Sequence, residues 1–457
     1  MVSALGELPP SRYDPRASSA GPSPPAPRPA RSVAGARPVD RASAVPCRVS
    51  DPRAAARITG GLFLAHALGS AGIIATGTVA SIVGADLSGR TSLAGLPLAA
   101  IQVGGAAAAV LVGALVETLG RRRGLTFAAV LGLAGMVAAA VAAVNGAFGA
   151  LLAGLVLAGT ASAAVKFARF TAAEIHPRAR RGRAVAIVVM GGAVGSVLGP
   201  ILVAPSGAFA RSLGWGELTG PYLAAVALFL LTALVFLALL RPEPRELAAR
   251  LETAGGEPEE VGPARPMRVL LRDPGVATAI VSLVLAQAVM VMVMGITSLH
   301  MRDHLHALSA ISVVFAGHTL GMFAFSLVSG WLTDRFGRIP VMLWGGAILL
   351  ASCLLAPIST AFLPLFVALF LLGYGWNLCY VAGSALLTDH LSTSETSRTQ
   401  GINDLLMGSV SAASSLAGGV VFAVYGFTAM SLAGAVASVL LLVLVVRYRV
   451  RRPAVAA

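Results

Sequence analysis

The chain alternates between long apolar runs and short polar segments along almost its whole length. A run of roughly 20 apolar residues crosses the hydrocarbon core of a bilayer as a helix. The pattern predicts twelve spans, at residues 58–82, 92–116, 124–144, 147–173, 183–204, 220–240, 274–299, 309–332, 339–357, 362–387, 400–424 and 427–446.

Polar stretches divide these spans into parts. Residues 241–273 hold six arginines and six glutamates, and we expect a solvated linker there. This linker separates one six-helix half at 57–240 from a second at 274–447. Eleven of the 26 prolines lie within the first 52 residues. Such a composition cannot bury enough surface to fold, so we expect a disordered tail at 1–56. A second short tail follows at 448–457.

The composition excludes an ordinary soluble domain. The 457 residues are 56% hydrophobic and 12% charged, whereas soluble domains carry about 25% charged residues. Because lipid cannot hydrogen-bond the backbone, many apolar runs imply a bundle of membrane-spanning helices. The net charge of +14 does not indicate a nucleic-acid partner, because the arginines lie between the spans and not on a face with stacking aromatics. The three cysteines show neither disulfide nor metal spacing.

The distribution of arginine predicts the orientation in the membrane. With the N-terminus inside, the inner segments hold 29 arginines and the outer loops hold three. Positive residues are retained on the cytoplasmic side of a membrane. Both termini are therefore expected in the cytoplasm.

Two related polar loops follow the second span of each half. Residues 330–338 read GWLTDRFGR, and residues 113–123 read GALVETLGRRR. Corresponding loops in corresponding places indicate an internal repeat. The second loop resembles the cytoplasmic loop motif of the major facilitator superfamily, and the first departs from it at Glu117 and Thr118. The resemblance implies an all-α membrane fold of twelve helices in two pseudo-symmetric halves.

The resemblance also implies a cytoplasmic gate built from ion pairs. Glu174, at the end of the fourth span, would pair with Arg121 or Arg122. Asp389, at the end of the tenth, would pair with Arg338. These contacts would hold the inner side shut in one state and break in the other. Static surface pairs worth about 0–1 kcal/mol each are the alternative.

Two further acids complete this candidate gate. Glu117 and Asp334 would face the N-termini of the eleventh and fifth spans, where a carboxylate meets the positive end of a helix dipole. The candidate gate residues are Gly113, Glu117, Gly120, Arg121, Arg122, Glu174, Gly330, Asp334, Arg335, Gly337, Arg338 and Asp389.

The fifth span carries small residues four apart, which allow two helices to approach closely. They are Gly191, Gly195 and Gly199, followed by Pro200. The pattern resembles the fifth-helix motif of the superfamily, which is associated with its antiporter branches. A helix-packing face is the alternative interpretation. Residues 285–323 and 371–388 resemble a bacterial subgroup whose substrates are unassigned.

Ionisable residues inside spans are costly and are therefore functional candidates. Lys166 is the sole lysine of the chain, and Arg169 lies one turn away on the same face. They could form a positive substrate site, or their side chains could reach the inner interface instead. Because we find no carboxylate deep in any span, neutral or anionic cargo fits better than a cationic drug.

Polar residues of the seventh and tenth spans are expected in the central cavity that the resemblance implies. Gln287, Trp376 and Asn377 are the candidates. Gly373 and Gly375 are expected to loosen the tenth helix at mid-depth, where transporters place substrates. Packing with an amide bond between helices is the alternative for Trp376 and Asn377.

Histidines gather near the predicted outer ends of the seventh and eighth spans. His300, His304 and His318 are candidates for carrying a coupling proton, because histidine titrates near neutral pH. An ordinary outer loop is the alternative. No third ligand stands at reliable spacing, so no metal site is expected.

These observations predict a secondary active transporter that moves a small organic solute by alternating access. We expect no enzyme and no cofactor, because no nucleophile–base pair emerges. A proton is the expected coupling ion, and efflux is slightly preferred. Proton-coupled import of a small anionic or neutral metabolite is the alternative, and a non-transporting membrane receptor is the alternative of another class. We expect a monomer in the plasma membrane.

Overall fold

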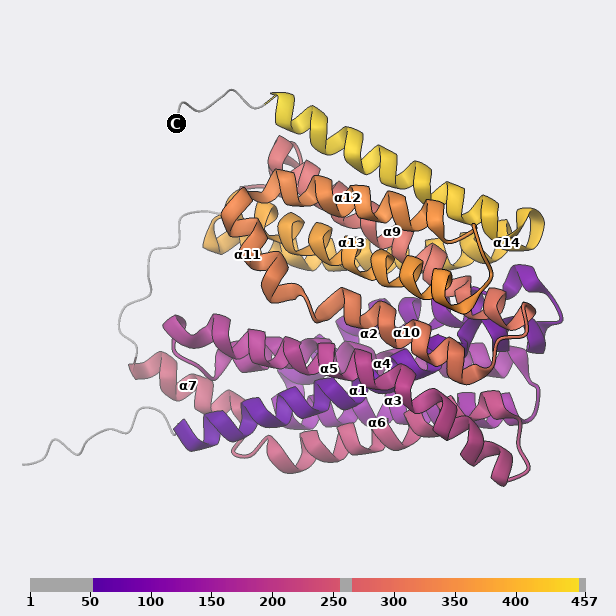
Figure 1. The fold of residues 1–457 in the computed structure, drawn as a ribbon. Helices are drawn as coiled ribbons and strands as arrows, with labels where there is room; N and C mark the ends of the chain where they lie inside the picture. The colour runs from indigo at the N-terminus through magenta and orange to yellow at the C-terminus, as the bar shows by residue number, and fades with distance from the viewer. Residues whose placement is uncertain (1–51, 255–264, 452–457) are drawn as a thin grey trace, which may run out of the picture. The chain divides into compact units, whose positions relative to one another are not determined.

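The computed structural model describes residues 52–254 and 265–451, and every element among them is helical (Figure 1). Of the predicted tails, residues 52–56 form the start of α1 and residues 448–451 the end of α14, whereas 1–51 and 452–457 lie outside the described residues. The elements are α1 Pro52–Ser88, η2 Thr91–Leu93, α2 Leu96–Leu119, α3 Arg121–Val144, α4 Phe148–Glu174, α5 Arg178–Ser212, η3 Glu217–Thr219, α6 Gly220–Leu239, α7 Pro244–Ala254, α8 Met267–Leu270, α9 Pro274–Asp303, α10 Leu308–Phe323, α11 Ser326–Phe336, α12 Arg338–Leu355, α13 Phe362–Asp389 and α14 Thr393–Arg451.

The helices confirm the predicted all-α membrane fold. Eleven segments of the described chain are long and apolar enough to cross a bilayer. One of them, within α14, covers two predicted spans. The two spans meet at Gly426, where the backbone leaves the helical conformation with φ 79° and ψ 179°. The eighth span consists of α10 and α11. The chain is therefore a multi-pass membrane protein.

Successive spans reverse direction, so their ends alternate between two membrane surfaces. We call the surface that carries Gly120, Gly337 and the start of α9 the arginine-rich surface. The opposite surface carries the loops at 89–95 and 304–307, and we call it the arginine-poor surface. The described parts of the predicted linker, residues 241–254 and 265–273, lie on the first. There α7 buries Leu247 in the core of the first half, so this part is packed against the bundle and not fully solvated as expected.

The two repeat loops have the same backbone geometry. Gly120 has φ 84° and ψ 169°, and Gly337 has φ 88° and ψ 164°. A side chain at such a φ is strained, whereas glycine adopts it readily. In each half this residue ends one helix and lets the next begin at an arginine, Arg121 in α3 and Arg338 in α12.

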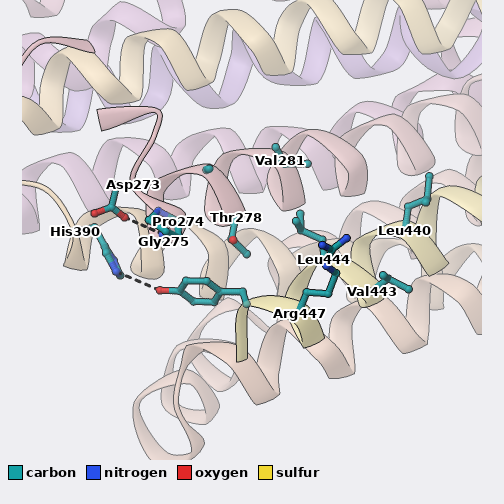
Figure 2. A pocket seen from close by; sticks show the side chains of 12 residues that line it. Asp273, Pro274, Gly275, Thr278, Val281, His390, Leu440, Val443, Leu444 and Arg447 are labelled. Carbon is teal, nitrogen blue, oxygen red and sulfur yellow. Dashed lines mark hydrogen bonds between the residues drawn. The ribbon is translucent and has the colours of Figure 1, made fainter. Parts of the chain in front are cut away.

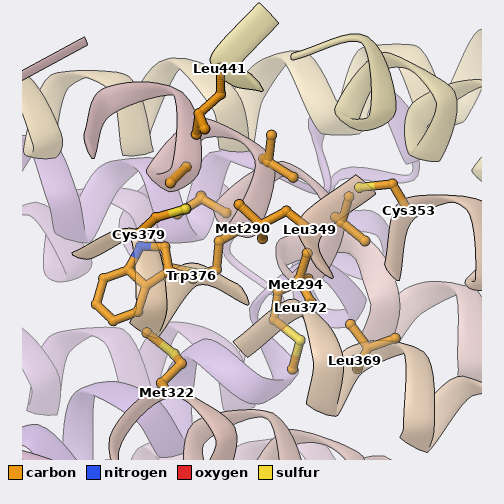
Figure 3. Packing of buried hydrophobic residues seen from close by; sticks show 14 of the residues in the cluster. Met290, Met294, Met322, Leu349, Cys353, Leu369, Leu372, Trp376, Cys379 and Leu441 are labelled. Carbon is orange, nitrogen blue, oxygen red and sulfur yellow. The ribbon is translucent and has the colours of Figure 1, made fainter. Parts of the chain in front are cut away.

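Apolar side chains fill the space between the helices of each half. Figure 3 shows the second half, where Met290 and Met294 of α9 lie one turn apart and pack among leucines of α12, α13 and α14. Cys353 and Cys379 are buried in the same cluster and are free thiols. Methionine fills irregular gaps of this kind because its side chain is unbranched.

Candidate functional site

An ion pair joins the two halves of the protein. Arg169 of α4 donates from Nη2 to Oδ2 of Asp404 in α14. Arg169 lies five residues before the end of α4, which places it roughly 8 Å along the helix from the arginine-rich surface. The sequence predicted Arg169 as a substrate-site cation beside Lys166 but did not identify Asp404 as its partner, and the fold brings the two together.

Lys166 lies one helical turn beyond Arg169, roughly 12 Å from the end of α4. The charges of Asp404 and Arg169 both act on its ammonium group. The side chain is exposed on the protein and lies beside the Arg169–Asp404 pair.

Aromatic and amide side chains of the second half extend this cluster. Tyr380 of α13 lies within range of the charges of Asp404 and Arg169, and its ring stacks on Trp376 at 4.7 Å between centroids. Trp376 donates from Nε1 to Oε1 of Gln287 at 2.9 Å. Gln287 in turn donates to the hydroxyl of Ser411 in α14 at 2.8 Å.

We call Lys166, Arg169, Gln287, Trp376, Tyr380, Asp404 and Ser411 the central cluster. It combines two cations, one carboxylate and an aromatic pair, and it draws on α4, α9, α13 and α14. Such a set can bind a planar solute through stacking and an anionic group through Lys166 and Arg169.

Asn377 is not part of the central cluster. Its Nδ2 donates to the carbonyl of Met322 at 2.6 Å and to the hydroxyl of Ser326 at 2.9 Å. Its Oδ1 accepts from Ser329 at 2.5 Å. The amide therefore satisfies backbone and hydroxyl groups at the break between α10 and α11, as buried polar groups require.

The helix interruption lies elsewhere than the sequence predicted. The expectation that Gly373 and Gly375 loosen the tenth span is wrong, because α13 runs unbroken from Phe362 to Asp389. A Cβ at Gly373 would lie 2.2 Å from the carbonyl oxygen of His318. These glycines allow neighbouring helices to approach α13, and the break occurs in the eighth span instead.

The repeat loops carry two ion pairs that match each other. Arg121 donates from Nε and Nη2 to the two carboxylate oxygens of Glu174, at 2.7 and 2.6 Å. Arg338 donates from Nε to Asp389 at 2.9 Å and from Nη2 at 3.5 Å. Each pair joins the third helix of a half to the end of the fourth, as expected from the resemblance.

The remaining gate candidates make local contacts. Asp334 is 79% exposed and approaches Arg338 at 3.7 Å. The backbone carbonyl of Glu117 accepts from Arg245 at 2.9 Å. Arg122 donates from Nε to the carbonyl of Leu237, and its backbone N–H donates to Glu243.

A Cβ added at Gly330 would meet no atom within 4 Å, whereas one at Gly113 would meet Phe167 at 3.8 Å. Arg335 lies in the last turn of α11.

The small residues of α5 lie against the backbone of α1. A Cβ at Gly191 or Gly195 would lie 2.2 or 2.0 Å from the carbonyl oxygen of Phe63 or Ala67. Gly199 continues the series against Ala71 at 2.7 Å, and Pro200 follows it inside the helix. The motif thus serves close packing in this structure.

The candidate histidines are not gathered at one place. His300 and His304 lie one turn apart at the end of α9, with ring centroids 4.4 Å apart. The His300 ring also stacks on Phe427 at 3.9 Å. His318 lies ten residues into α10, where it is buried and its Nδ1 is 2.8 Å from the carbonyl of Leu369. Among the described residues, no three His, Cys, Asp or Glu side chains are grouped so that they could hold a metal ion.

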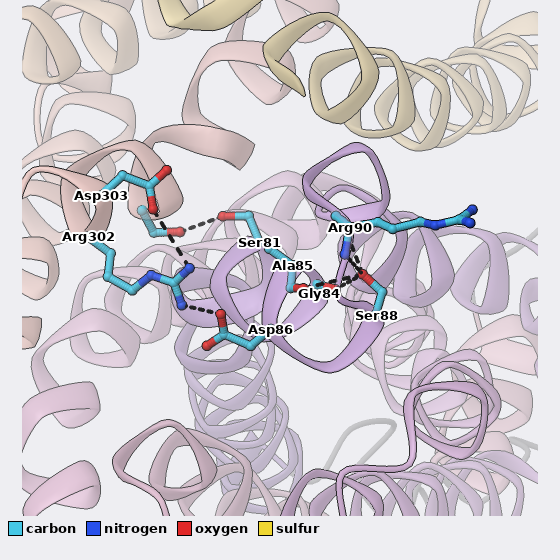
Figure 4. Close-up of polar contacts among 9 residues, drawn as sticks. Ser81, Gly84, Ala85, Asp86, Ser88, Arg90, Arg302 and Asp303 are labelled. Atoms are coloured by element: carbon cyan, nitrogen blue, oxygen red, sulfur yellow. Dashed lines mark hydrogen bonds and ion pairs between the residues drawn. The ribbon is translucent and has the colours of Figure 1, made fainter. Parts of the chain in front are cut away.

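A second set of contacts joins the halves near the arginine-poor surface, and Figure 4 shows those of Arg302 and Ser81. Arg302 at the end of α9 donates to Asp86 of α1 at 2.5 Å. The hydroxyls of Ser81 and Ser298 lie 2.8 Å apart. Ser415 of α14 donates to the carbonyl of Gly95 at 2.8 Å. We call these contacts the far-side latch.

Tyr380, Asp404 and Ser411 of the central cluster were not among the substrate-site residues predicted from the sequence. Asp404 was not predicted, because nothing in the sequence shows that α14 brings it opposite Arg169. Tyr380 lies four residues beyond Trp376 in the same span. That spacing places the two rings on one helix face, and it was the signal available for adding Tyr380 to the site.

Comparisons with known proteins agree with this architecture. The sequence model of the Major Facilitator Superfamily matches residues 62–301 and again 279–457. The uncharacterized MFS-type transporter YdeG of Bacillus subtilis is 34% identical over 394 residues, which cover 85% of this chain and 91% of that protein. The riboflavin transporter RfnT of Brucella anthropi is 28% identical over 377 residues, which cover 81% and 90%.

A solved structure shares the fold at low sequence identity. It is the xylose transporter XylE from E. coli in a partially occluded inward open conformation, with a TM-score of 0.62 and 15% identity. The similarity covers 85% of this chain and 97% of that one.

Proposed function

The chain belongs to the Major Facilitator Superfamily, and from that premise we propose that it is a proton-coupled carrier of a small neutral or anionic organic solute. The coarser function, secondary transport of a small molecule, is that of the family. The ion pair between Arg169 and Asp404 is the observation on which the finer proposal rests.

The carrier operates in the plasma membrane as a monomer, with both termini in the cytoplasm. The arginine distribution supports this orientation. The arginine-rich surface is then the cytoplasmic one. The far-side latch closes the outer side in the present state, and the loops at Gly120 and Gly337 contact the opposite half when the protein opens outward. In that state Glu117 and Asp334 meet helix N-termini of the other half.

Asp404 is the proton-binding residue of this proposal. In the present state its carboxylate neutralises Arg169. Protonation removes that negative charge, so Arg169 and Lys166 become available to an anionic or strongly polar solute. Proton binding and solute binding then favour one another, as a symporter requires. Competition between them, which an antiporter requires, does not follow from this arrangement.

The aromatic pair sets the shape of the cargo. Trp376 and Tyr380 lie with their ring planes 16° apart, and Gln287 holds the indole in place. A planar ring system can add to such a stack. Riboflavin is the first solute to test, because a relative with 28% identity over most of this chain is named a riboflavin transporter.

Export by proton antiport is the second candidate. The sequence Gly191–Pro200 favours it, because it resembles the fifth-helix motif of antiporter branches. Its glycines support the packing of α5 on α1 in this structure. An antiport function would need a proton site whose occupancy weakens solute binding, and His300 with His304 is the remaining candidate pair.

Uptake of labelled riboflavin into proteoliposomes tests the proposal. A gradient that is acidic outside should accelerate uptake, and Asp404→Asn should make transport independent of the gradient. Glu246→Gln, which removes an exposed acid on α7, should behave like the wild type. Acceleration by the opposite gradient would support antiport. If uptake of riboflavin and of a panel of organic anions into the proteoliposomes is no greater than into empty liposomes, the result would favour a receptor that has lost transport.

A further inference from the structure

A pocket of about 740 Å³ lies apart from the central cluster, at the arginine-rich end of the second half (Figure 2). It is lined by the first two turns of α9, by residues 440–448 of α14 and by His390 after α13. None of its lining residues belongs to the proposed gate, latch or substrate site. Its function is therefore a separate question.

The long walls of the pocket are apolar and accessible. Leu440, Val443 and Leu444 follow one face of α14 at spacings of three and four residues, and Val281 of α9 also lines the pocket. Val281 is 43% exposed, Leu440 56% and Val443 48%. Both helices belong to membrane-spanning segments. The medium that meets these side chains is therefore lipid hydrocarbon.

A cation stands at one end of this apolar groove. Arg447 lies about two helical turns after Leu440 on the same face, roughly 10 Å along α14. Its side chain is exposed, and no carboxylate of the described chain forms an ion pair with it. The acid that lines the pocket, Asp273, is engaged by backbone groups. Its Oδ1 accepts from the N–H groups of Gly275 and Val276, at 2.8 and 3.1 Å.

The surroundings of Arg447 have the composition of a membrane interface. The segment before α9 carries Val269 and Leu271, 46% and 42% exposed, beside Arg268 and Arg272. Exposed apolar residues next to arginines are typical of elements that lie at the level of the lipid headgroups. The polar end of the pocket thus lies at headgroup depth, and its apolar end lies among the acyl chains.

We propose that this pocket binds an anionic phospholipid of the cytoplasmic leaflet. One acyl chain lies along Val281, Leu440 and Leu444, and the phosphate group pairs with Arg447. The hydrogen bond between Tyr448 and Nε2 of His390, at 3.3 Å, fixes the floor of the pocket beneath the headgroup. The proposal uses the same orientation as the transport function but does not depend on the transported solute.

Native mass spectrometry of the full-length protein tests the site. The protein in detergent is titrated with phosphatidylglycerol, phosphatidylcholine or glycerol 3-phosphate, and the bound molecules are counted after the detergent has been removed in the mass spectrometer. Phosphatidylglycerol should be retained in preference to phosphatidylcholine. Arg447→Gln should weaken its binding about fivefold, the factor expected for one arginine at an anionic lipid surface. Val443→Trp should reduce binding by filling the groove, and unchanged thermal unfolding would show that this variant is folded.

Arg449→Gln is the matched control. It removes the same charge only two residues from Arg447, and the Arg449 side chain does not line the pocket. It should leave lipid binding unchanged. An equal loss in both arginine variants would mean unspecific attraction and would overturn the proposal. Displacement of the lipid by glycerol 3-phosphate would identify a soluble phosphate site instead, and equal retention of the two lipids would contradict the role of Arg447.

Discussion

Arg169 and Asp404 come from different halves of the chain, 235 positions apart. Each alone would be a charge within or beside an apolar segment, which is costly to desolvate. Together they neutralise one another and leave Lys166 as the excess cation nearby. Protonation of the Asp404 carboxylate would therefore change the charge balance around Arg169 and Lys166, the residues that would contact the solute.

The aromatic pair gives a prediction about solute affinity. Trp376→Ala removes the ring that stacks on Tyr380 and the N–H that holds Gln287. Affinity for riboflavin should fall roughly two- to tenfold, the range expected for an aromatic contact. Trp331→Ala, which removes an exposed indole on α11, is the control. The same affinity in both variants, measured by equilibrium binding to purified protein, would move the site away from Trp376.

A pH prediction concerns Glu395, at the start of α14. Hydrogen bonds from the Arg265 side chain, and then from the backbone of Ser392 and Arg265, hold the pKa of this buried carboxyl well below its usual range. A carboxyl with a depressed pKa stabilises the folded state above its unfolded-state pKa of about 4.3, and the effect is lost as the pH falls below it.

Glu395→Gln should therefore lower the Tm by a few degrees at neutral pH. The difference from the wild type should shrink as the pH falls below about 4. Thermal unfolding in detergent measures both, with Glu246→Gln as a control that removes an exposed acid. A gap that persists unchanged at low pH would mean that the carboxylate charge is not what stabilises this contact.

Residue-level prediction from the sequence succeeded where a motif supplied the partner. The loop motif predicted Arg121 or Arg122 as the partner of Glu174 and Arg338 as the partner of Asp389, and the pairs Arg121–Glu174 and Arg338–Asp389 are present. Asn377 could not be placed in the same way, because its partners lie at a helix break in α10 and α11 that no proline or glycine marks. The pairing of Asp404 needed the three-dimensional arrangement of the two halves.

At the level of elements, apolar run length predicted nearly every helix. The repeated polar motif predicted the loops at Gly120 and Gly337, and the structure shows that both glycines have a positive φ, which glycine adopts readily. Glycines inside helices were harder to interpret, because the same residue can loosen a helix or bring two helices together. Gly373 does the second, since His318 leaves no room for a side chain there.

The packing of α5 on α1 gives a prediction with a control on the same helix. A Cβ at Gly195 would lie 2.0 Å from the carbonyl oxygen of Ala67, whereas one at Gly182 would meet nothing within 4 Å. Gly195→Ala should cost about 1–3 kcal/mol through overpacking. Gly182→Ala should be neutral or stabilising by up to about 1 kcal/mol, because alanine favours helix. Thermal unfolding that ranks the two variants in the opposite order would contradict this interface.

At the level of the whole molecule, the sequence indicated the internal repeat but not the conformational state, that is, at which membrane surface the two halves are in contact. The two halves meet through the far-side latch of Ser81, Asp86, Gly95 and their partners, and through the Arg169–Asp404 pair nearer the arginine-rich surface. Which surface is closed depends on small differences between interfaces, and a sequence pattern does not resolve them. Transport requires these contacts to open and re-form in each cycle.

A disulfide across the far-side latch tests this requirement most directly. Ser81→Cys and Ser298→Cys place two thiols where hydroxyl oxygens lie 2.8 Å apart, in a background with Cys47, Cys353 and Cys379 replaced by alanine. Riboflavin uptake is measured after oxidation, again after reduction, and in each single variant. The account predicts that the cross-linked protein is inactive, that reduction restores uptake, and that the single variants are unaffected. Full uptake by the cross-linked protein would contradict alternating access through this interface.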